Sequence, residues 1–230
     1  MSWNKGLTKE TDYRVLKISQ TMRNKQVDNF RKWRDKMKEI GKIPSGYPPF
    51  SESEDLAEYI GVVLGDGNIG KFPRTERIII VGNANNDGFI RRYTKLTESL
   101  FKKKPALSHD NSANAVRISL YQKKISKRLN VPVGNRSKFD IILPSWIWKN
   151  KKYLISFLRG LFEAEGSLSV HIPTGTYNFQ FKNQNKSLLK IVLRGLKLLG
   201  YHPEIRINSI RLRKKIEVEN FRKLIRFRVY

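Results

Sequence analysis

Apolar residues recur along the chain with two periods, helical and alternating, which succeed each other in a fixed order from residue 51 onward. Leu56, Tyr59, Ile60, Val63 and Leu64 have helical spacing after a Ser- and Asp-rich start. The pattern predicts a helix that starts at Ser51 and ends at Gly67, strands near 69–72 and 77–82, a helix over 87–101, strands near 106–109 and 115–121, and a helix near 122–130. The order of elements is therefore α-β-β-α-β-β-α.

The same order begins again after a connection at residues 131–150, which contains Pro132, Gly134 and Pro144. The second set is a helix over 151–165, strands near 167–172 and 177–183, a helix over 187–199, strands near 204–207 and 210–213, and a helix over 217–225. At a constant spacing of 99 residues Gly61 aligns with Gly160, Asp66 with Glu165 and Asn86 with Asn185. We therefore expect an α+β fold built as a tandem pseudo-twofold duplication, with repeats at 51–130 and 151–230.

Residues 1–50 differ from both repeats. They are polar, dense in Lys, Arg, Asn and Gln, and end in a Pro-rich stretch at 43–50. A helix over 27–40 would place Phe30, Trp33, Met37 and Ile40 on one face, which is more typical of a docking face than of a site. The pattern indicates an appendage followed by a linker.

Charge is the strongest feature of the composition. The chain has 46 Lys and Arg against 20 Asp and Glu, a formal charge of +26. A charge of this size repels itself in a compact fold and is usually kept because a polyanion neutralises it, which makes nucleic acid the expected partner. The alternatives are a solubility device and a membrane-surface binder, but the basic residues spread along the whole chain instead of forming one amphipathic helix.

Apolar segments are too short to span a bilayer, and no secretory signal opens the sequence. We therefore expect no membrane partner and an intracellular location, with bacterial cytoplasm, a phage-encoded origin and an organelle all left open. There are no cysteines, which excludes disulfides, thiolate zinc sites and a cysteine nucleophile. The three histidines are not spaced like a ligand pair, so a metal would be a hard cation held by carboxylate oxygens.

Two matching segments carry candidate chemistry. The first runs from Gly61 through Gly65 to Asp66 and Gly67, and the second from Gly160 through Ala164 to Glu165 and Gly166. Small residues four apart lie on one helical face and allow two backbones to approach closely. Because glycine inside a helix costs about 1 kcal/mol relative to alanine, these glycines indicate that the two helices pack against each other along the twofold axis.

Each of these helices ends in a carboxylate followed by glycine, the residue expected to terminate a helix. The helix dipole disfavours an acid at that end, and the twofold contact would bring Asp66 and Glu165 close together. A bound divalent cation, Mg²⁺ or a similar ion such as Mn²⁺, explains both features, and the expected chemistry is metal-assisted hydrolysis of a phosphodiester. The alternative is a pair of solvated helix-end acids, which the repetition of the pair disfavours.

Residues 59–67 and 158–166 resemble the two signature helices of monomeric LAGLIDADG homing endonucleases. The resemblance covers about residues 51–230. It implies the homing endonuclease fold, αββαββα repeated twice, with two antiparallel four-stranded saddles over DNA. It also implies cleavage of a long asymmetric double-stranded DNA target across the minor groove to leave short 3′ overhangs, with Asp66 and Glu165 as the metal ligands.

The resemblance implies further helpers for catalysis. A polar residue at the end of the second strand of each repeat would position water or phosphate, which indicates Gln184 and, at the 99-residue spacing, Asn85. A basic residue after the last helix of a repeat would be Arg136 or Lys138. No equivalent is identified in the second repeat, which leaves open whether the two strands are cut at equal rates.

Strand faces supply candidate DNA contacts. Along 177–184, Tyr177, Phe179 and Phe181 alternate with polar residues, which predicts one core face and one wet face. Amide and cationic side chains address base edges in the major groove, although ordinary solvated strand faces look similar. The candidates are Asn178, Gln180, Lys182, Arg206, Asn208, Arg211 and Arg213 in the second repeat and Arg77, Arg117 and Ser119 in the first, with Arg74 as a phosphate contact and His171 as a contact or a surface histidine without a role.

The first 25 residues resemble the short nuclease-associated modular DNA-binding motif, with Trp3, Asn4 and Lys5 as the contacting group. The alternative is a flexible basic tail that binds phosphate nonspecifically. For the whole chain, the rival to an endonuclease is a noncatalytic binder on the same scaffold, either an RNA maturase with intron RNA as partner or a DNA-binding regulator. Retention of both acids favours the enzyme, acting as a monomer. A structural protein that coats nucleic acid would not explain the duplication.

Overall fold

A computed structural model describes residues 3–25, 30–43, 46–110, 112–137 and 139–230. Contacts between Cα atoms divide the chain into two units, 1–47 and 48–230. The first unit contains α1 (Tyr13–Asn24) and α2 (Arg31–Glu39). Helix α1 begins after Asp12, whose carboxylate accepts the backbone N–H groups of Arg14 and Val15. The sequence pattern did not predict α1. Helix α2 lies within the predicted helix at 27–40, whose first residues, 27–29, are outside the described residues.

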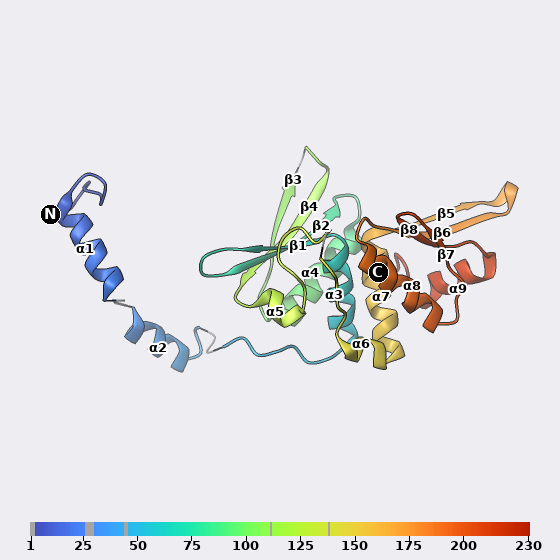
Figure 1. The fold of residues 1–230 in the computed structure, drawn as a ribbon, viewed down its shortest axis with the longest axis horizontal. Coiled ribbons are helices and arrows are strands. Elements are labelled where there is room, and N and C mark those ends of the chain that lie inside the picture. Colours follow the sequence, from blue (N-terminus) through green and yellow to red (C-terminus); the bar gives the residue numbers. More distant parts are fainter. Residues whose placement is uncertain (1–2, 26–29, 44–45, 111, 138) are drawn as a thin grey trace. The chain divides into compact units, whose positions relative to one another are not determined.

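The second unit contains two repeats of mixed helices and strands (Figure 1). The first repeat consists of α3 (Glu54–Gly65), β1 (Gly67–Lys71), β2 (Glu76–Asn83), α4 (Asp87–Phe101), β3 (Ala106–Asp110), β4 (Ala115–Gln122) and α5 (Ile125–Leu129). After α6 (Ser145–Lys149), the second consists of α7 (Lys151–Glu165), β5 (Gly166–His171), the short 3₁₀ turn η1 (Ile172–Thr174), β6 (Thr176–Lys182), α8 (Lys186–Leu198), β7 (Glu204–Arg206), β8 (Ser209–Leu212) and α9 (Lys215–Leu224).

Strand pairing is antiparallel and repeats between the two sheets. Their orders are β1-β2-β4-β3 and β5-β6-β8-β7. The second strand of each repeat is therefore central in its sheet, and the third strand forms an edge. This arrangement confirms the predicted α+β duplication of αββαββα.

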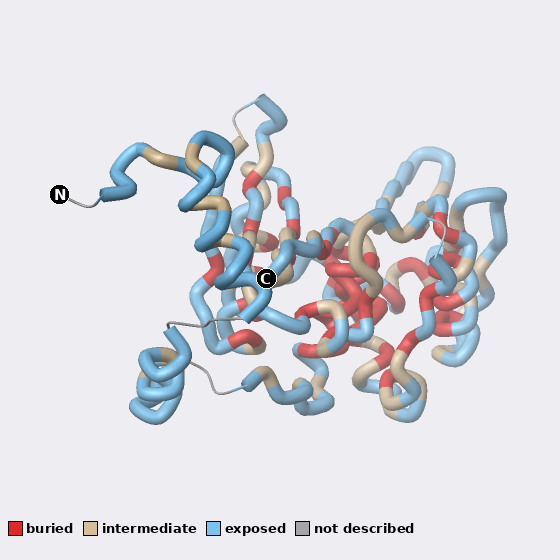
Figure 2. The backbone as a smooth tube through the Cα atoms, turned by 60° about the vertical axis from the view of Figure 1, so that its left-hand side comes forward, coloured by how far each residue is buried: buried red, intermediate tan, exposed pale blue. Residues whose placement is uncertain are grey.

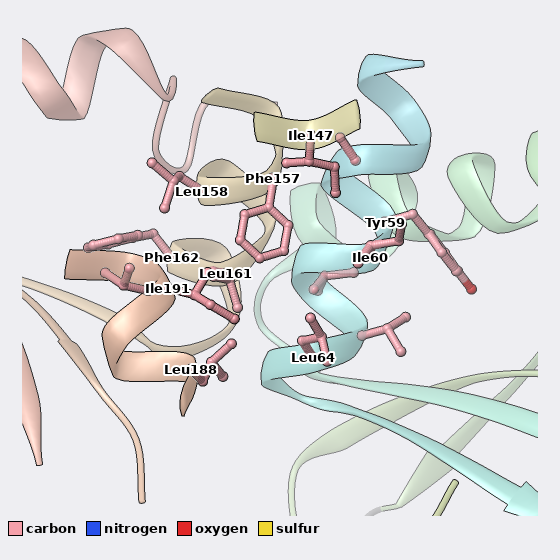
Figure 3. Packing of buried hydrophobic residues seen from close by; sticks show 14 of the residues in the cluster. Tyr59, Ile60, Leu64, Ile147, Phe157, Leu158, Leu161, Phe162, Leu188 and Ile191 are labelled. Carbon is pink, nitrogen blue, oxygen red and sulfur yellow. The ribbon is translucent and has the colours of Figure 1, made fainter. Parts of the chain in front are cut away.

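Helices α3 and α7 lie side by side between the two sheets, and their shared face is the centre of the core (Figures 1 and 2). Figure 3 shows Ile60 and Leu64 of α3 facing Phe157 and Leu161 of α7. The glycines make this approach possible. A Cβ on Gly61 would overlap the carbonyl oxygen of Phe157, and one on Gly160 would overlap that of Glu58. The predicted close packing of the motif helices is therefore present, and glycine is required because backbone meets backbone.

A buried ionic cluster crosses the same helix interface. The side chain of Glu58 on α3 is 3% exposed and accepts hydrogen bonds from Arg92 and Tyr93 of α4. The guanidinium of Arg159 on α7 lies 3.5 Å from the same carboxylate. Two positive partners and a phenol offset the cost of burying this acid. Because the cluster joins three helices, it fixes the register of α3 against α7.

Several predicted elements differ from the structure. The helix expected near 122–130 is shorter, because Lys124 and Asn130 adopt left-handed backbone conformations on either side of α5. The connection at 131–150 contains the unpredicted α6, and the strand expected at 204–207 ends at Arg206. The glycines after the two acids do not close the helices in a left-handed conformation. Gly166 is extended, with φ −79° and ψ 139°, and its Cβ would collide with the backbone of Phe162.

Among the described residues, the structure contains no helix with the length and apolar character that crossing a membrane requires.

Candidate functional site

The two predicted acids lie where the paired helices end. Asp66 follows the last residue of α3, and Glu165 is the last residue of α7. A Cβ on Gly65 would overlap the methyl of Ala164 and lie 3.3 Å from Cγ of Glu165. The close approach of the two helices therefore continues to their C-terminal ends. It brings together two carboxylates that are 99 residues apart in the sequence.

Both acids have raised pKa values. Asp66 keeps solvent-exposed surface, but the protein around it disfavours its charge and raises its pKa to about 7, with a second contribution from the negative charge of Glu165. Burial also raises the pKa of Glu165, and a hydrogen bond from Asn183 opposes this shift. The site therefore concentrates negative charge in a poorly solvated place, where a positive ligand would be stabilised.

Asn183, which sequence patterns did not identify, is the amide that contacts an acid. Its Nδ2 donates to Oε1 of Glu165 over 3.1 Å, and its Oδ1 accepts the backbone N–H of Asn185 over 2.8 Å. The turn after β6 thus holds the amide against the acid. Asn83 accepts the N–H of Asn85 in the same way in the first repeat. This repeated asparagine turn was the signal available in the sequence. At the 99-residue spacing, however, the equivalent of Asn183 is Ala84, which has no amide.

Arg136 links the two repeats through different atoms. Its Nη2 donates to the carbonyl oxygens of Val63, over 2.8 Å, and Gly67. Its own carbonyl oxygen accepts Nδ2 of Asn185, the N-cap of α8, over 2.6 Å. The guanidinium therefore supplies positive charge at the C-terminal end of α3, beside Asp66. Burial lowers the pKa of Arg136, and its Nη1 is buried without a hydrogen-bond partner.

A cleft of about 770 Å³ opens at this junction. Its lining includes Glu165, Gln184, Arg136, Asn183 and Asn208. The structure thus brings together three of the predicted catalytic residues, Glu165, Gln184 and Arg136, close to Asp66. Asn85 lies in the turn before α4 and is not part of this lining. Lys138 lies outside the described residues.

The donors at this junction suit a hard divalent cation. Asp66 and Glu165 offer carboxylate oxygens, and Asn183 lies next to Glu165. Among the described residues, no group of three or more His, Asp or Glu side chains could hold a metal. Mg²⁺ fits a site with so few protein ligands, because it commonly binds through one or two carboxylates and keeps waters and substrate phosphates as its other ligands.

In the second repeat, most predicted DNA contacts lie on the sheet face opposite the buried residues. Phe179 and Phe181 are buried on one side of β6, whereas Asn178, Gln180 and Lys182 point to the other. Arg206 and Arg211 share that outer face, where Glu204 pairs with both. Arg213 follows β8, and Asn208 lies in the turn between β7 and β8, where Oδ1 accepts from Lys186. His171 ends β5, and its Nδ1 lies 2.7 Å from the hydroxyl of Thr174.

The first repeat orients its candidates in the same way. Ser119 and Arg117 lie on the outer face of β4, and Arg117 pairs with Asp110 over 2.5 Å. Arg77 of β2 has its guanidinium 5.5 Å from the ring centre of Phe72 and 5.7 Å from that of Tyr121, whose hydroxyl accepts from it. Arg74 is exposed in the β1–β2 turn. The ion pairs of Arg117 and Arg211 were not predicted, although each acid precedes its arginine by seven residues in both repeats.

In the N-terminal unit, Trp3, Asn4 and Lys5 are exposed. The guanidinium of Arg14 on α1 lies 5.2 Å from the ring centre of Trp3. Trp3 also lines a shallow, open groove along α1 with Tyr13, Ile18 and Met22. Trp3 thus shares one exposed surface with the first helix.

Comparisons with known proteins agree with this architecture. The family model of the LAGLIDADG-like domain matches residues 152–227, the second repeat. No curated protein matches the chain. Similar solved structures include mesophilic variants of the homing endonuclease I-DmoI, at 19% identity over 75% of this chain and 94% of that chain with a TM-score of 0.53. I-DmoI in complex with DNA and Mn matches at 18% identity over 75% and 96%, with a TM-score of 0.51.

The N-terminal LAGLIDADG domain of DUF199/WhiA is similar to the same degree, at 19% identity over 77% of this chain and 83% of that chain with a TM-score of 0.52. Identities this low show a shared fold. Residues 152–227 therefore match the LAGLIDADG-like domain, and the duplicated chain shares its fold with LAGLIDADG homing endonucleases.

Proposed function

We propose that this protein is a site-specific DNA endonuclease that hydrolyses both strands of a long asymmetric target with the help of a divalent cation. The observation that carries the proposal is the junction of Asp66 and Glu165, two acids of raised pKa held together at the ends of packed helices. Two acids in this position repel each other and interact unfavourably with the helix dipoles. Binding of a cation therefore explains their presence better than a purely structural role does.

DNA is the substrate that the rest of the molecule fits. The formal charge is +26, and the outer faces of both sheets carry cations and amides. I-DmoI, which shares the fold, is described in complex with DNA and Mn and in complex with DNA and Ca. One chain supplies both repeats, so the protein acts as a monomer. The N-terminal unit, with Trp3, Asn4 and Lys5, extends the contact with DNA.

The residues of the junction have separate tasks. Asp66 and Glu165 hold Mg²⁺ or Mn²⁺ in their deprotonated forms, and Asn183 orients Glu165. Arg136 holds the end of α3 and supplies positive charge beside Asp66. Gln184 is exposed in the cleft, where its amide can orient a water molecule. When bound there, a divalent cation would supply the Lewis acidity that activates water and stabilises negative charge on the phosphate.

The two junction acids are unequally supported. Glu165 accepts a hydrogen bond from Asn183, whereas among the described residues no side chain donates a hydrogen bond to Asp66. Aspartate and glutamate also differ in length by one methylene. We propose that the two DNA strands are cut at unequal rates, so that a nicked duplex accumulates during the reaction.

The test is selection from a randomised duplex library for molecules cleaved in the presence of Mg²⁺ or Mn²⁺. The proposal predicts enrichment of one long asymmetric sequence that is cut in both strands. Selection for binding on the same library serves as the comparison. If one sequence is enriched by binding and no sequence is cut with either ion, the protein is a noncatalytic binder and the proposal is wrong.

A further inference from the structure

The outer faces of the two sheets differ at equivalent positions of their central strands. Gly67, next to Asp66, pairs with Ile80 of β2, and Gly166, next to Glu165, pairs with Phe181 of β6. Counted from the two acids, Val81 therefore corresponds to Lys182. Two residues away on the same faces, Ile79 corresponds to Gln180. The first repeat has aliphatic side chains where the second has an amide and a cation.

The aliphatic residues in the first sheet are not part of the core. Ile78 and Ile80 fill the buried face of β2, with exposed fractions of 1%. Val81 points the other way and is 37% exposed, and Ile79 lies beside it, half-buried. Tyr121 and Phe72 extend the same apolar surface, with ring centres 5.7 Å apart. An exposed apolar patch on a central strand marks a place where a partner removes water from it.

The second sheet has no apolar side chain at the paired outer positions of its strands. These positions are Ser167, Ser169, His171, Thr176, Asn178, Gln180, Lys182, Glu204, Arg206, Ser209 and Arg211. Such a face can recognise a partner only by hydrogen bonds and charge. The two repeats are therefore alike in backbone and different in recognition chemistry.

We propose that the first repeat recognises thymine through its 5-methyl group, with Ile79 and Val81 as the contacting residues, while the second repeat reads its half of the target by hydrogen bonds. The inference rests on the proposed function, in which these faces enter the major groove. There the thymine methyl is the apolar feature of a base edge, and Asn and Gln are suited to adenine.

The position of Val81 places these contacts near the cut. Gly67 of β1 pairs with Ile80 of the antiparallel strand β2. Asp66 precedes Gly67 and Val81 follows Ile80, so these two residues are neighbours one step beyond that pair. Arg77 lies on the other side of Ile79, away from Asp66. Thymine recognition therefore concerns base pairs next to the scissile phosphates, and Arg77, held by Phe72 and Tyr121, contacts base pairs further out.

The experiment measures binding without metal to the duplex recovered by selection, with deoxyuridine replacing thymidine at one position at a time. Uracil lacks only the methyl group. We expect affinity to fall about fourfold for each methyl that Ile79 or Val81 buries, and no change for uracil in the other half of the target. Equal effects in both halves, or no effect in either, would overturn the inference.

Two variants assign the effect to the protein. Because the sequence has no cysteine, Pro73→Cys in the β1–β2 turn can carry a tethered iron chelate that cuts nearby DNA and so identifies the half under the first repeat. Ile79→Gln with Val81→Lys gives the first repeat the side chains of the second. In that variant the uracil penalty is expected to disappear and the base preference in that half to move from thymine toward adenine and guanine. A penalty that persists in this variant contradicts the assignment.

Failure of the inference is distinguishable from failure of the proposed function. If the endonuclease proposal fails through loss of cleavage alone, the binding measurements still report methyl dependence. If binding shows no sequence preference at all, both proposals are wrong. Specific binding and cleavage without any methyl dependence would leave the endonuclease intact and reject only the thymine contacts.

Discussion

The amide nitrogen of Asn183 lies 3.1 Å from a carboxylate oxygen of Glu165, and the same side chain accepts the backbone N–H of Asn185. Asn185 in turn donates to the carbonyl oxygen of Arg136, whose guanidinium holds the end of α3 next to Asp66. One hydrogen-bonded path therefore runs from the acid of the second repeat to the helix end that carries the acid of the first. The junction is positioned by both repeats together.

Replacing Asn183 by Ala is expected to weaken the response to metal. The hydrogen bond stabilises the carboxylate of Glu165 more than its neutral form. Without it the pKa of Glu165 therefore rises further. A partner that orients a metal ligand is typically worth about 10- to 100-fold in metal affinity or activity. The measurement is cleavage rate against Mg²⁺ concentration at fixed pH. Asn83→Ala, which removes the same asparagine turn in the first repeat, is the matched control, and an equal shift in both variants would contradict the assignment of Asn183.

Gly61→Ala is expected to destabilise the fold by about 3 kcal/mol or more, because the added methyl meets the carbonyl oxygen of Phe157 and the backbone nitrogen of Leu161, neither of which can move alone. Gly195→Ala on α8 is the control. Its methyl would meet only side-chain carbons of Leu154 and Leu158, at 3.3–3.4 Å. Urea denaturation of both variants measures the difference. Equal stability of the two would show that α3 and α7 do not pack as described.

Asp66→Asn is expected to stabilise the metal-free protein at pH 8. The folded protein raises the pKa of Asp66 from 3.8 to about 7, so the native state binds this proton more tightly than the unfolded chain. Protonated Asp66 makes its full contribution to the free energy of unfolding below about pH 4. This contribution is lost as the pH rises through about 7. Because Asp66 keeps solvent access, the gain at pH 8 should be about 1–2 kcal/mol, less than the full shift implies.

The corresponding measurement is the free energy of unfolding of Asp66→Asn relative to wild type at pH 4.5 and pH 8 in the presence of a chelator. Asp140→Asn, which removes the same charge from an exposed position, is the control. The account requires the gain to be larger at pH 8 than at pH 4.5 for Asp66 only. A gain that does not change with pH would place the carboxylate in ordinary solvent.

The sequence was sufficient for the architecture because each signal was repeated. The 99-residue spacing aligned both motif helices, and α4 and α7 have the predicted bounds. Contacts that depend on where a turn closes were not predictable. Asn183 and Gln184 are adjacent and chemically alike, and only the end of β6 at Lys182 decides which amide faces Glu165.

Other residues were assigned the right place for an incomplete reason. Gly166 was expected as the residue that terminates α7, and it does follow the helix, but glycine is required there because a Cβ would meet the backbone of Phe162. Arg136 was expected beside the acids, and its contacts with Val63 and Asn185 depend on a connection whose path carries no periodic pattern. Hydrophobic periodicity predicts helices, strands and their buried faces, whereas the contacts at helix ends and between helices arise from tertiary packing.

The central claim is that Asp66 and Glu165 together hold the cation that cleavage requires. The most direct test compares wild type with the double variant Asp66→Asn/Glu165→Gln on the selected target, measuring DNA affinity and Mg²⁺-dependent cleavage in the same preparations. The account predicts that affinity remains within about threefold, because the outer faces are unchanged, while cleavage falls below detection. Cleavage by the double variant at more than about a hundredth of the wild-type rate would contradict it, because loss of the metal ligands should remove the metal contribution altogether.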